Sequence, residues 1–228
     1  MPPISTPEPI TRAYRVAMTL CSPVIRRWAR LEVEGLEHMP DHGPVLLAGN
    51  HDSYWDPVAI GVAAFPRRQI RALAKSSLWK IRGLDRVLDG MGQIPIERGK
   101  GDQHALDRAI EELRAGACIG IFPEGTRSLG RELRARSGFG RLAEAVPDAE
   151  VVCVAVSGTV DIPRFPKRPR VRVKFFTPAG GGLAHGEEAA ALAVRLLAEI
   201  RGHAPITVAG RKRRKPESPA TREPVARP

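Results

Sequence analysis

Short apolar runs that alternate with helical patterns constrain the fold of this chain most strongly. The runs at residues 45–49, 118–122 and 151–156 are almost wholly apolar. Between them, as in residues 106–117, apolar side chains recur every three or four positions, which is typical of amphipathic helices. Strands that are apolar along their whole length are typical of parallel sheets with helices on both faces. The sequence therefore predicts a single α/β domain with a largely parallel central sheet flanked by helices.

The same patterns predict the other elements and the domain limits. We expect further strands at residues 70–74, 93–98 and 171–176, and helices at residues 57–64, 77–88, 106–117 and 187–200. The chain divides into a disordered leader (1–9), a basic amphipathic helix (10–31), one folded domain (32–208) and a basic disordered tail (209–228).

Residues 10–31 form an apolar stripe at helical spacing with arginines on the opposite side. Two interpretations are open: an anchor that lies in a membrane surface, or a helix that packs on its own domain with its arginines in water. Pro23 is expected to kink or split the helix. The uncharged stretch at residues 16–25 is shorter than the roughly 20 residues that span a bilayer, so no transmembrane segment is predicted.

The charge of the chain favours a polyanionic partner. The formal net charge is +11, and residues 211–228 carry seven Lys or Arg against two Glu. Such a charge suits nucleic acid or an anionic membrane. Aromatic residues make up only 5 %, which argues against nucleic acid as a partner. The three cysteines, Cys21, Cys118 and Cys153, have neither disulfide-framework nor zinc-ligand spacing, which fits a reducing cytoplasm.

His51 and Asp56 follow the apolar run at residues 45–49. They would not meet on a regular helix, but they can meet where the chain turns from a strand into a helix. A histidine there can take a proton from a substrate hydroxyl while the carboxylate fixes its tautomer. The alternative is that Asp56, before Pro57, only caps a helix and that His51 is an ordinary turn residue.

Residues 122–127 (Phe-Pro-Glu-Gly-Thr-Arg) leave another apolar run through a tight turn. Gly125 permits a positive φ, Thr126 adds a hydroxyl, and the Arg127 guanidinium matches phosphate oxygens. Lys75 and Arg98 follow two further predicted strands. Three cations after three strands can converge at one edge of a sheet and bind a phosphate. The alternative is that each cation is an ordinary surface charge and that Glu124 and Arg127 only form an ion pair with each other.

Taken together, residues 50–56, 95–98 and 122–127 resemble, in this order, three sequence blocks of the glycerolipid acyltransferases, the 1-acylglycerol-3-phosphate acyltransferase (PlsC-like) family. The resemblance covers roughly residues 30–180. A fourth block matches residues 151–158, except that Cys153 occupies the place of a proline. The Phe-Lys-x-Gly stretch that the family often has is matched only loosely by residues 136–139.

The resemblance implies that His51 deprotonates the free hydroxyl of a lysophospholipid and that Asp56 supports it. It implies that Lys75, Arg98 and Arg127 hold the acceptor's phosphate in a pocket shaped by Glu124, Gly125 and Thr126. The acyl donor would be acyl-CoA or acyl-carrier protein, with no metal or other cofactor. The protein would bind anionic lipid peripherally at the cytoplasmic face of the cell membrane.

Two other classes of function remain open at this stage. The departures at Cys153 and residues 136–139 leave room for a non-catalytic binder of anionic lipid on the same fold. The basic cluster at residues 211–215 leaves room for a nucleic-acid binder, although no nucleic-acid motif is visible. Another lysolipid or glycolipid could also replace 1-acylglycerol-3-phosphate as the acceptor.

Overall fold

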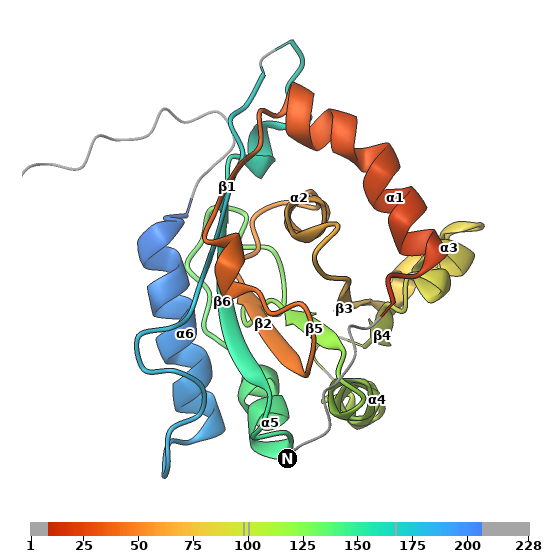
Figure 1. Cartoon of the computed structure of the whole chain (residues 1–228). Coiled ribbons are helices and arrows are strands. Elements are labelled where there is room, and N and C mark those ends of the chain that lie inside the picture. The colour runs from red at the N-terminus through yellow and green to blue at the C-terminus, as the bar shows by residue number, and fades with distance from the viewer. Residues whose placement is uncertain (1–8, 98, 100, 167, 207–228) are drawn as a thin grey trace, which may run out of the picture.

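Seven strands form one sheet at the centre of the molecule (Figure 1). The computed structural model describes residues 9–97, 99, 101–166 and 168–206. In chain order the strands are β1 (Glu32–Glu34), β2 (Val45–Gly49), β3 (Ile70–Lys75), β4 (Ile94–Ile96), β5 (Cys118–Ile121), β6 (Glu150–Ser157) and β7 (Arg172–Phe176). In space their order is β1-β7-β6-β2-β5-β3-β4. Neighbouring strands are parallel except for β6 and β7, which confirms the predicted sheet.

Helices cover both faces of this sheet (Figure 1). The α-helices are α1 (Arg12–Ser22), α2 (Asp56–Ala64), α3 (Leu84–Gly90), α4 (Gln103–Arg114), α5 (Gly138–Ala145) and α6 (Ala189–His203). The shorter turns are the π-helix η1 (Pro23–Trp28) and the 3₁₀ helices η2 (Leu36–His38), η3 (Ser76–Lys80) and η4 (Thr159–Asp161). Helices α1 and α2 pack on one face, and α4, α5 and α6 pack on the other.

The alternation of side chains along the central strands produces these two cores. In β2, Val45 and Leu47 belong to the core under α1 and α2, whereas Leu46 and Ala48 belong to the core under α4, α5 and α6. All five residues of β2 are buried, as expected of a strand covered on both faces. The sheet is therefore a rigid support whose carboxyl edge can hold a site.

The N-terminal helix divides at Pro23 into α1 and the π-helix η1, as predicted. Its predicted stripe packs on the domain, with Tyr14 and Ile25 buried in the core with α2. The outer face still carries apolar side chains, since Leu20 is 73 % exposed and Val16 57 % exposed. Among the residues that the structure describes, no helix combines the length and apolarity needed to cross a membrane.

Three features differ from the sequence-based expectations. The single helix predicted at residues 77–88 is wrong: η3 and α3 are separated by Gly83, whose φ of +86° is not helical. Strand β1 and helix α5 were not predicted, and each is short, with three and eight residues. Residues 1–8 of the predicted leader (1–9) and the whole of the predicted tail (209–228) lie outside the described residues.

Candidate active site

The carboxyl ends of β2 and β5 bring residues 50–56 and 122–128 together. The two strands are parallel neighbours, with Ala48 opposite Ile121. Because the chain turns sharply between β2 and α2, His51 and Asp56 meet across five positions, and His51 Nδ1 lies 3.0 Å from Asp56 Oδ2. The expectation that the two residues meet at a strand–helix turn is therefore confirmed.

The Asp56 carboxylate is completely buried and has four hydrogen-bond partners. Besides His51, its Oδ2 accepts bonds from the backbone N–H groups of Asp52 at 2.6 Å and Ser53 at 2.7 Å. Its Oδ1 accepts the hydroxyl of Thr159, which comes from the turn after β6. The helix-cap interpretation is wrong, because α2 begins at Asp56 itself and the carboxylate turns back to the preceding residues. A carboxylate held this firmly favours a proton on Nδ1 and leaves Nε2 as the base.

The His51 ring is only slightly exposed and lies flat against Phe122. The two ring centroids are 4.3 Å apart, and the planes differ by 12°. The backbone is held as well: the His51 N–H donates to Glu124 Oε2 at 2.7 Å, and the His51 carbonyl accepts the Ser128 N–H at 2.8 Å. Within the described residues, Nε2 has no hydrogen-bond partner, so it is available to a substrate.

Glu124 lies beside His51 and is only 2 % exposed. Its second carboxylate oxygen accepts a bond from Arg201, near the end of α6. Burial raises the pKa of Glu124 above its ordinary value, although the bonds from Arg201 and the His51 N–H oppose that rise. These contacts suit a residue that positions His51, and the predicted part of Glu124 in the phosphate pocket stays a prediction.

The described members of the predicted phosphate site, Lys75, Thr126 and Arg127, lie at or after the ends of neighbouring strands at one edge of the sheet. Strands β5, β3 and β4 are parallel neighbours, so the residues that follow them share that edge. Lys75 is exposed at the end of β3, and the Arg127 guanidinium stacks 3.6 Å above the Tyr54 ring. Thr126 is exposed, and Gly125 has the positive φ that the turn requires, +68°. Arg98 lies outside the described residues.

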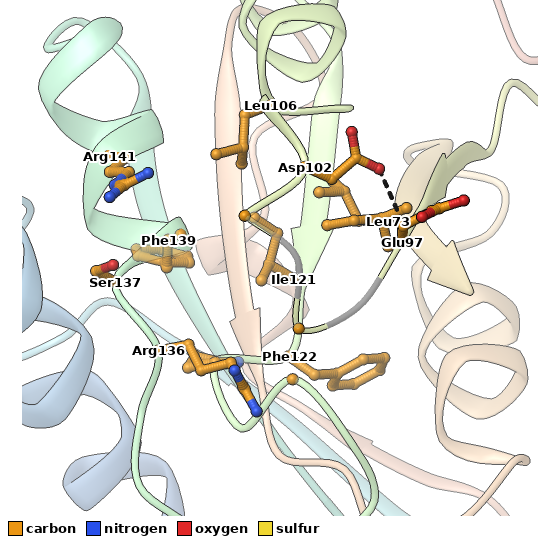
Figure 2. A pocket seen from close by; sticks show the side chains of 16 residues that line it. Leu73, Glu97, Asp102, Leu106, Ile121, Phe122, Arg136, Ser137, Phe139 and Arg141 are labelled. Atoms are coloured by element: carbon orange, nitrogen blue, oxygen red, sulfur yellow. Dashed lines mark hydrogen bonds between the residues drawn. The ribbon is translucent and has the colours of Figure 1, made fainter. Parts of the chain in front are cut away.

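Two cavities open on either side of Phe122, which contributes to both. The larger, of about 260 Å³, has Arg136 and Arg141 on one side and Glu97 and Asp102 on the other (Figure 2). Gly125 also lines it, so it adjoins the arginine turn. The smaller cavity, of about 200 Å³, is almost wholly apolar and lies between α1, α2, α3 and the sheet, with Tyr14, Met18, Leu47, Val58, Ile60, Leu78 and Leu88 in its wall.

Four residues that contact the pair or its neighbours were not singled out from the sequence. Asp52 and Ser128 lie within or beside the two motifs, so their positions offered a local signal. Thr159 lies 103 positions from Asp56, and Arg201 lies 149 positions from Asp52 and 77 from Glu124. Only the tertiary structure brings them to the site.

Within the described part of the chain, no group of three or more His, Cys, Asp or Glu residues is arranged to hold a metal ion. The predicted independence from metals and other cofactors stays a prediction, since an enzyme can bind such groups in other ways. The arrangement of charge suits proton transfer at His51, beside the smaller, apolar cavity and the edge of the sheet that carries Lys75 and Arg127.

Comparison with known proteins agrees with this geometry. Over 108 residues the chain is 38 % identical to a 1-acyl-sn-glycerol-3-phosphate acyltransferase of Borreliella burgdorferi, a match covering 46 % of this chain and 42 % of that protein. A Bacillus subtilis protein of the same name is 28 % identical over 98 residues, covering 43 % of this chain and 49 % of the relative. The chain thus aligns with less than half the length of these curated relatives.

A solved structure supports the fold. The crystal structure of the 1-acyl-sn-glycerophosphate acyltransferase PlsC from Thermotoga maritima superposes with a TM-score of 0.57, covering 85 % of this chain and 84 % of that one at 20 % identity. Residues 30–160, which contain both motifs, match the family model described as Acyltransferase. The chain therefore belongs to the acyltransferase family.

Proposed function

We propose that this protein moves a fatty acyl group from acyl-CoA or an acyl-carrier-protein thioester to the free hydroxyl of a lysophospholipid. The acceptor favoured by the named relatives is 1-acylglycerol-3-phosphate, which would give phosphatidic acid. The observation that carries the proposal is the contact of 3.0 Å between His51 Nδ1 and the buried Asp56, with Nε2 free of protein partners within the described residues.

The chemistry follows from that contact. His51 Nε2 takes the proton of the acceptor hydroxyl as its oxygen attacks the thioester carbonyl. The C–S bond then breaks, and the imidazolium returns the proton to the leaving thiolate, so an ester and a free thiol are formed. Asp56 stabilises the imidazolium between these two steps.

A protein nucleophile is not needed for this reaction. The Ser128 hydroxyl donates to Asp52 and is buried, so it is already engaged. Cys153 is buried in the sheet, and burial raises the pKa of its thiol to about 12, which keeps it protonated at neutral pH. Direct attack by the acceptor hydroxyl is therefore the simplest mechanism that these residues support.

The two cavities suggest where the substrates lie. The smaller one suits the acyl chain of the donor, because its wall is apolar and it adjoins Phe122, which stacks on His51. The basic edge with Lys75, Arg127 and the predicted Arg98 suits the acceptor phosphate. Gly125 and Thr126 would shape the same pocket, and no other cofactor is required.

The outer face of α1 and η1 supports peripheral binding to an anionic membrane. Val16, Leu20 and Val24 form an exposed apolar row at four-residue spacing, and exposed Arg12 and Arg15 flank it. Apolar side chains that enter a lipid surface and arginines that meet its anionic headgroups would bring His51 to a membrane-bound acceptor. We place this contact at the cytoplasmic face of the membrane.

A second acceptor is supported by two further relatives. Proteins named lyso-ornithine lipid O-acyltransferase from Pseudomonas aeruginosa and Rhizobium meliloti are 31 % and 32 % identical over 119 and 117 residues. An acceptor without the glycerol phosphate would make less use of Arg127 and Lys75. Acceptor identity is thus the main question that an assay has to answer.

The test is a panel of acyl-CoA and acyl-carrier-protein donors against 1-acylglycerol-3-phosphate, other lysophospholipids and lyso-ornithine lipid. Products are identified by mass spectrometry, and thiol release is measured in parallel. We expect transfer to 1-acylglycerol-3-phosphate that His51→Ala abolishes. Lipid binding without turnover by any donor would refute the proposal and favour a non-catalytic binder.

A further inference from the structure

Arg201 connects the last described helix to the backbone of the proposed base. It lies near the end of α6, and its side chain is 14 % exposed. Its two terminal nitrogens contact Asp52 Oδ2 and Oδ1, each at 2.9 Å, and one of them also contacts Glu124 Oε1. One guanidinium therefore bridges two nearly buried carboxylates that come from different motifs.

Each of these carboxylates holds a part of the chain next to His51. Glu124 uses its other oxygen to accept the His51 N–H at 2.7 Å. Asp52 is the residue after His51, and its side chain is held in addition by Asn50 Nδ2 at 3.1 Å and by the Ser128 hydroxyl. The position of His51 thus depends on both groups that Arg201 bridges.

Helix α6 gives Arg201 a fixed base from which to act. Leu192, Leu196 and Ile200 are fully buried in the core between α6 and the sheet. Because α6 is packed firmly against the sheet, the Arg201 guanidinium loses little conformational freedom when it binds. It can therefore hold the two carboxylates in fixed positions. Arg201 does not line either cavity beside Phe122.

We infer that Arg201 is a positioning residue for acyl transfer, which sets both the geometry and the electrostatic environment of His51 through Glu124 and Asp52. The inference rests on the proposed function, because it concerns the base of that reaction. It assigns to α6, which lies beyond the matched residues 30–160, a part in the activity.

The charges around His51 explain why an arginine is needed there. Asp56 contacts the imidazole ring, and Glu124 contacts the His51 backbone N–H. Asp52 is the next residue along the chain, and Arg201 from α6 pairs with both Asp52 and Glu124. From the turn after β6, the neutral Thr159 donates its hydroxyl to Asp56. Without the guanidinium, the negative charges of Asp52 and Glu124 beside His51 would lose their common counter-charge, and their field would favour the imidazolium, which cannot act as a base.

The experiment compares Arg201→Met and Arg201→Lys with Arg195→Met in the full chain. Arg195 is the matched control, since it lies on the same helix and contacts both oxygens of Glu187 at 2.9 Å, away from the site. Folding is checked by thermal unfolding. Kinetics are measured from pH 5 to 9 with the best donor and acceptor of the wild-type panel.

We expect Arg201→Met to lower kcat about 100-fold, the typical effect of a small misplacement of a catalytic group, with both KM values nearly unchanged. The acidic limb of its kcat/KM profile should move to higher pH. Arg201→Lys should keep the wild-type limb, because the charge remains, but should lose part of kcat, because one ammonium group cannot bridge both carboxylates as the planar fork does. Arg195→Met should keep the wild-type kcat and pH profile.

The inference is overturned if folded Arg201→Met keeps the kcat and the pH profile of the wild type. It is also overturned if Arg201→Met loses no more kcat than Arg195→Met does. If Arg201→Met does not fold, the test rests on Arg201→Lys, and an unchanged kcat in Arg201→Lys then overturns the inference. An inactive wild-type chain would instead refute the proposed function, so the two failures are distinguishable.

Discussion

His51 and Asp56 are five positions apart in the chain, yet Nδ1 and Oδ2 lie within 3.0 Å of each other because a turn separates them. Asp56 also stabilises this turn, because its carboxylate accepts hydrogen bonds from the backbone N–H groups of Asp52 and Ser53. The same carboxylate therefore shapes the turn and orients the imidazole. Changing it should affect the chemistry more than the binding of substrates.

We expect Asp56→Asn to lower kcat by about 10²- to 10⁴-fold, the usual contribution of a positioned acid–base group. The amide can still fill the site but cannot stabilise the imidazolium. Steady-state kinetics measure the effect. The control is Asp41→Asn, because Asp41 contacts His42 in an exposed pair at the surface. A small loss in Asp56→Asn, similar to that of the control, would mean that the pair has no part in catalysis.

Glu124 should make the stability of the protein depend on pH. Burial raises its pKa in the folded state, so the folded state binds the proton more tightly than the unfolded chain does. This proton stabilises the folded protein fully at a pH below the pKa of Glu124 in the unfolded chain, about 4.3. The stabilisation is lost as the pH rises through the pKa of Glu124 in the folded protein. The unfolding free energy of the wild type, relative to Glu124→Gln, should therefore fall as the pH rises from about 4.

Urea unfolding at several pH values tests this, with Glu187→Gln as a control of opposite sign. The hydrogen bond from Arg195 lowers the pKa of Glu187 in the folded protein to about 2. Glu187 therefore stabilises the fold at a pH above its pKa in the unfolded chain, and this stabilisation is lost as the pH falls toward its pKa in the folded protein. A wild-type advantage over Glu124→Gln that grows with rising pH would contradict the proposed environment of Glu124.

The sequence was most informative where local pattern decides the structure. Apolar runs and turn residues predict the strands β2 (Val45–Gly49) and β5 (Cys118–Ile121) and the meeting of His51 with Asp56. The bridge from Arg201 could not be predicted, because a single arginine in an amphipathic helix gives no sign of the partner that it meets across 149 positions. The break at Gly83 was missed because the apolar residues around it keep a helical spacing.

Arg127 should contribute to acceptor binding. Its guanidinium is held over the Tyr54 ring at the edge of the sheet, so it is oriented before a phosphate arrives. We expect Arg127→Gln to raise the KM for 1-acylglycerol-3-phosphate about 10- to 100-fold with a smaller change in kcat, since hydrogen bonds to charged groups contribute ~1.5–3 kcal/mol. Arg131→Gln, an exposed arginine of the same loop, is the control. Equal KM values in the two variants would exclude Arg127 from the acceptor site.

The small cavity should limit the length of the acyl chain. Ala74 lines it, and a leucine there would occupy part of the space of about 200 Å³. We expect Ala74→Leu to lower kcat/KM for the longest donors most, because each methylene excluded from the cavity loses ~0.8 kcal/mol of apolar transfer. A series of donors of increasing chain length measures the shift, and Ala191→Leu, on the exposed face of α6, is the control. An equal loss at every chain length would place the acyl group elsewhere.

Leu20 should take part in membrane binding. It is 73 % exposed on α1, between Val16 and Val24, and burying a leucine in lipid contributes ~1.5–3 kcal/mol. Leu20→Glu should therefore weaken binding to anionic vesicles by about tenfold or more, because the carboxylate also repels the headgroups. Val194→Glu is the matched control: Val194 is 58 % exposed on α6, which packs on the opposite face of the sheet. Co-sedimentation at two salt concentrations separates the apolar from the electrostatic contribution, since only the latter weakens with salt. If both variants bind vesicles equally well, α1 is not the surface that meets the membrane.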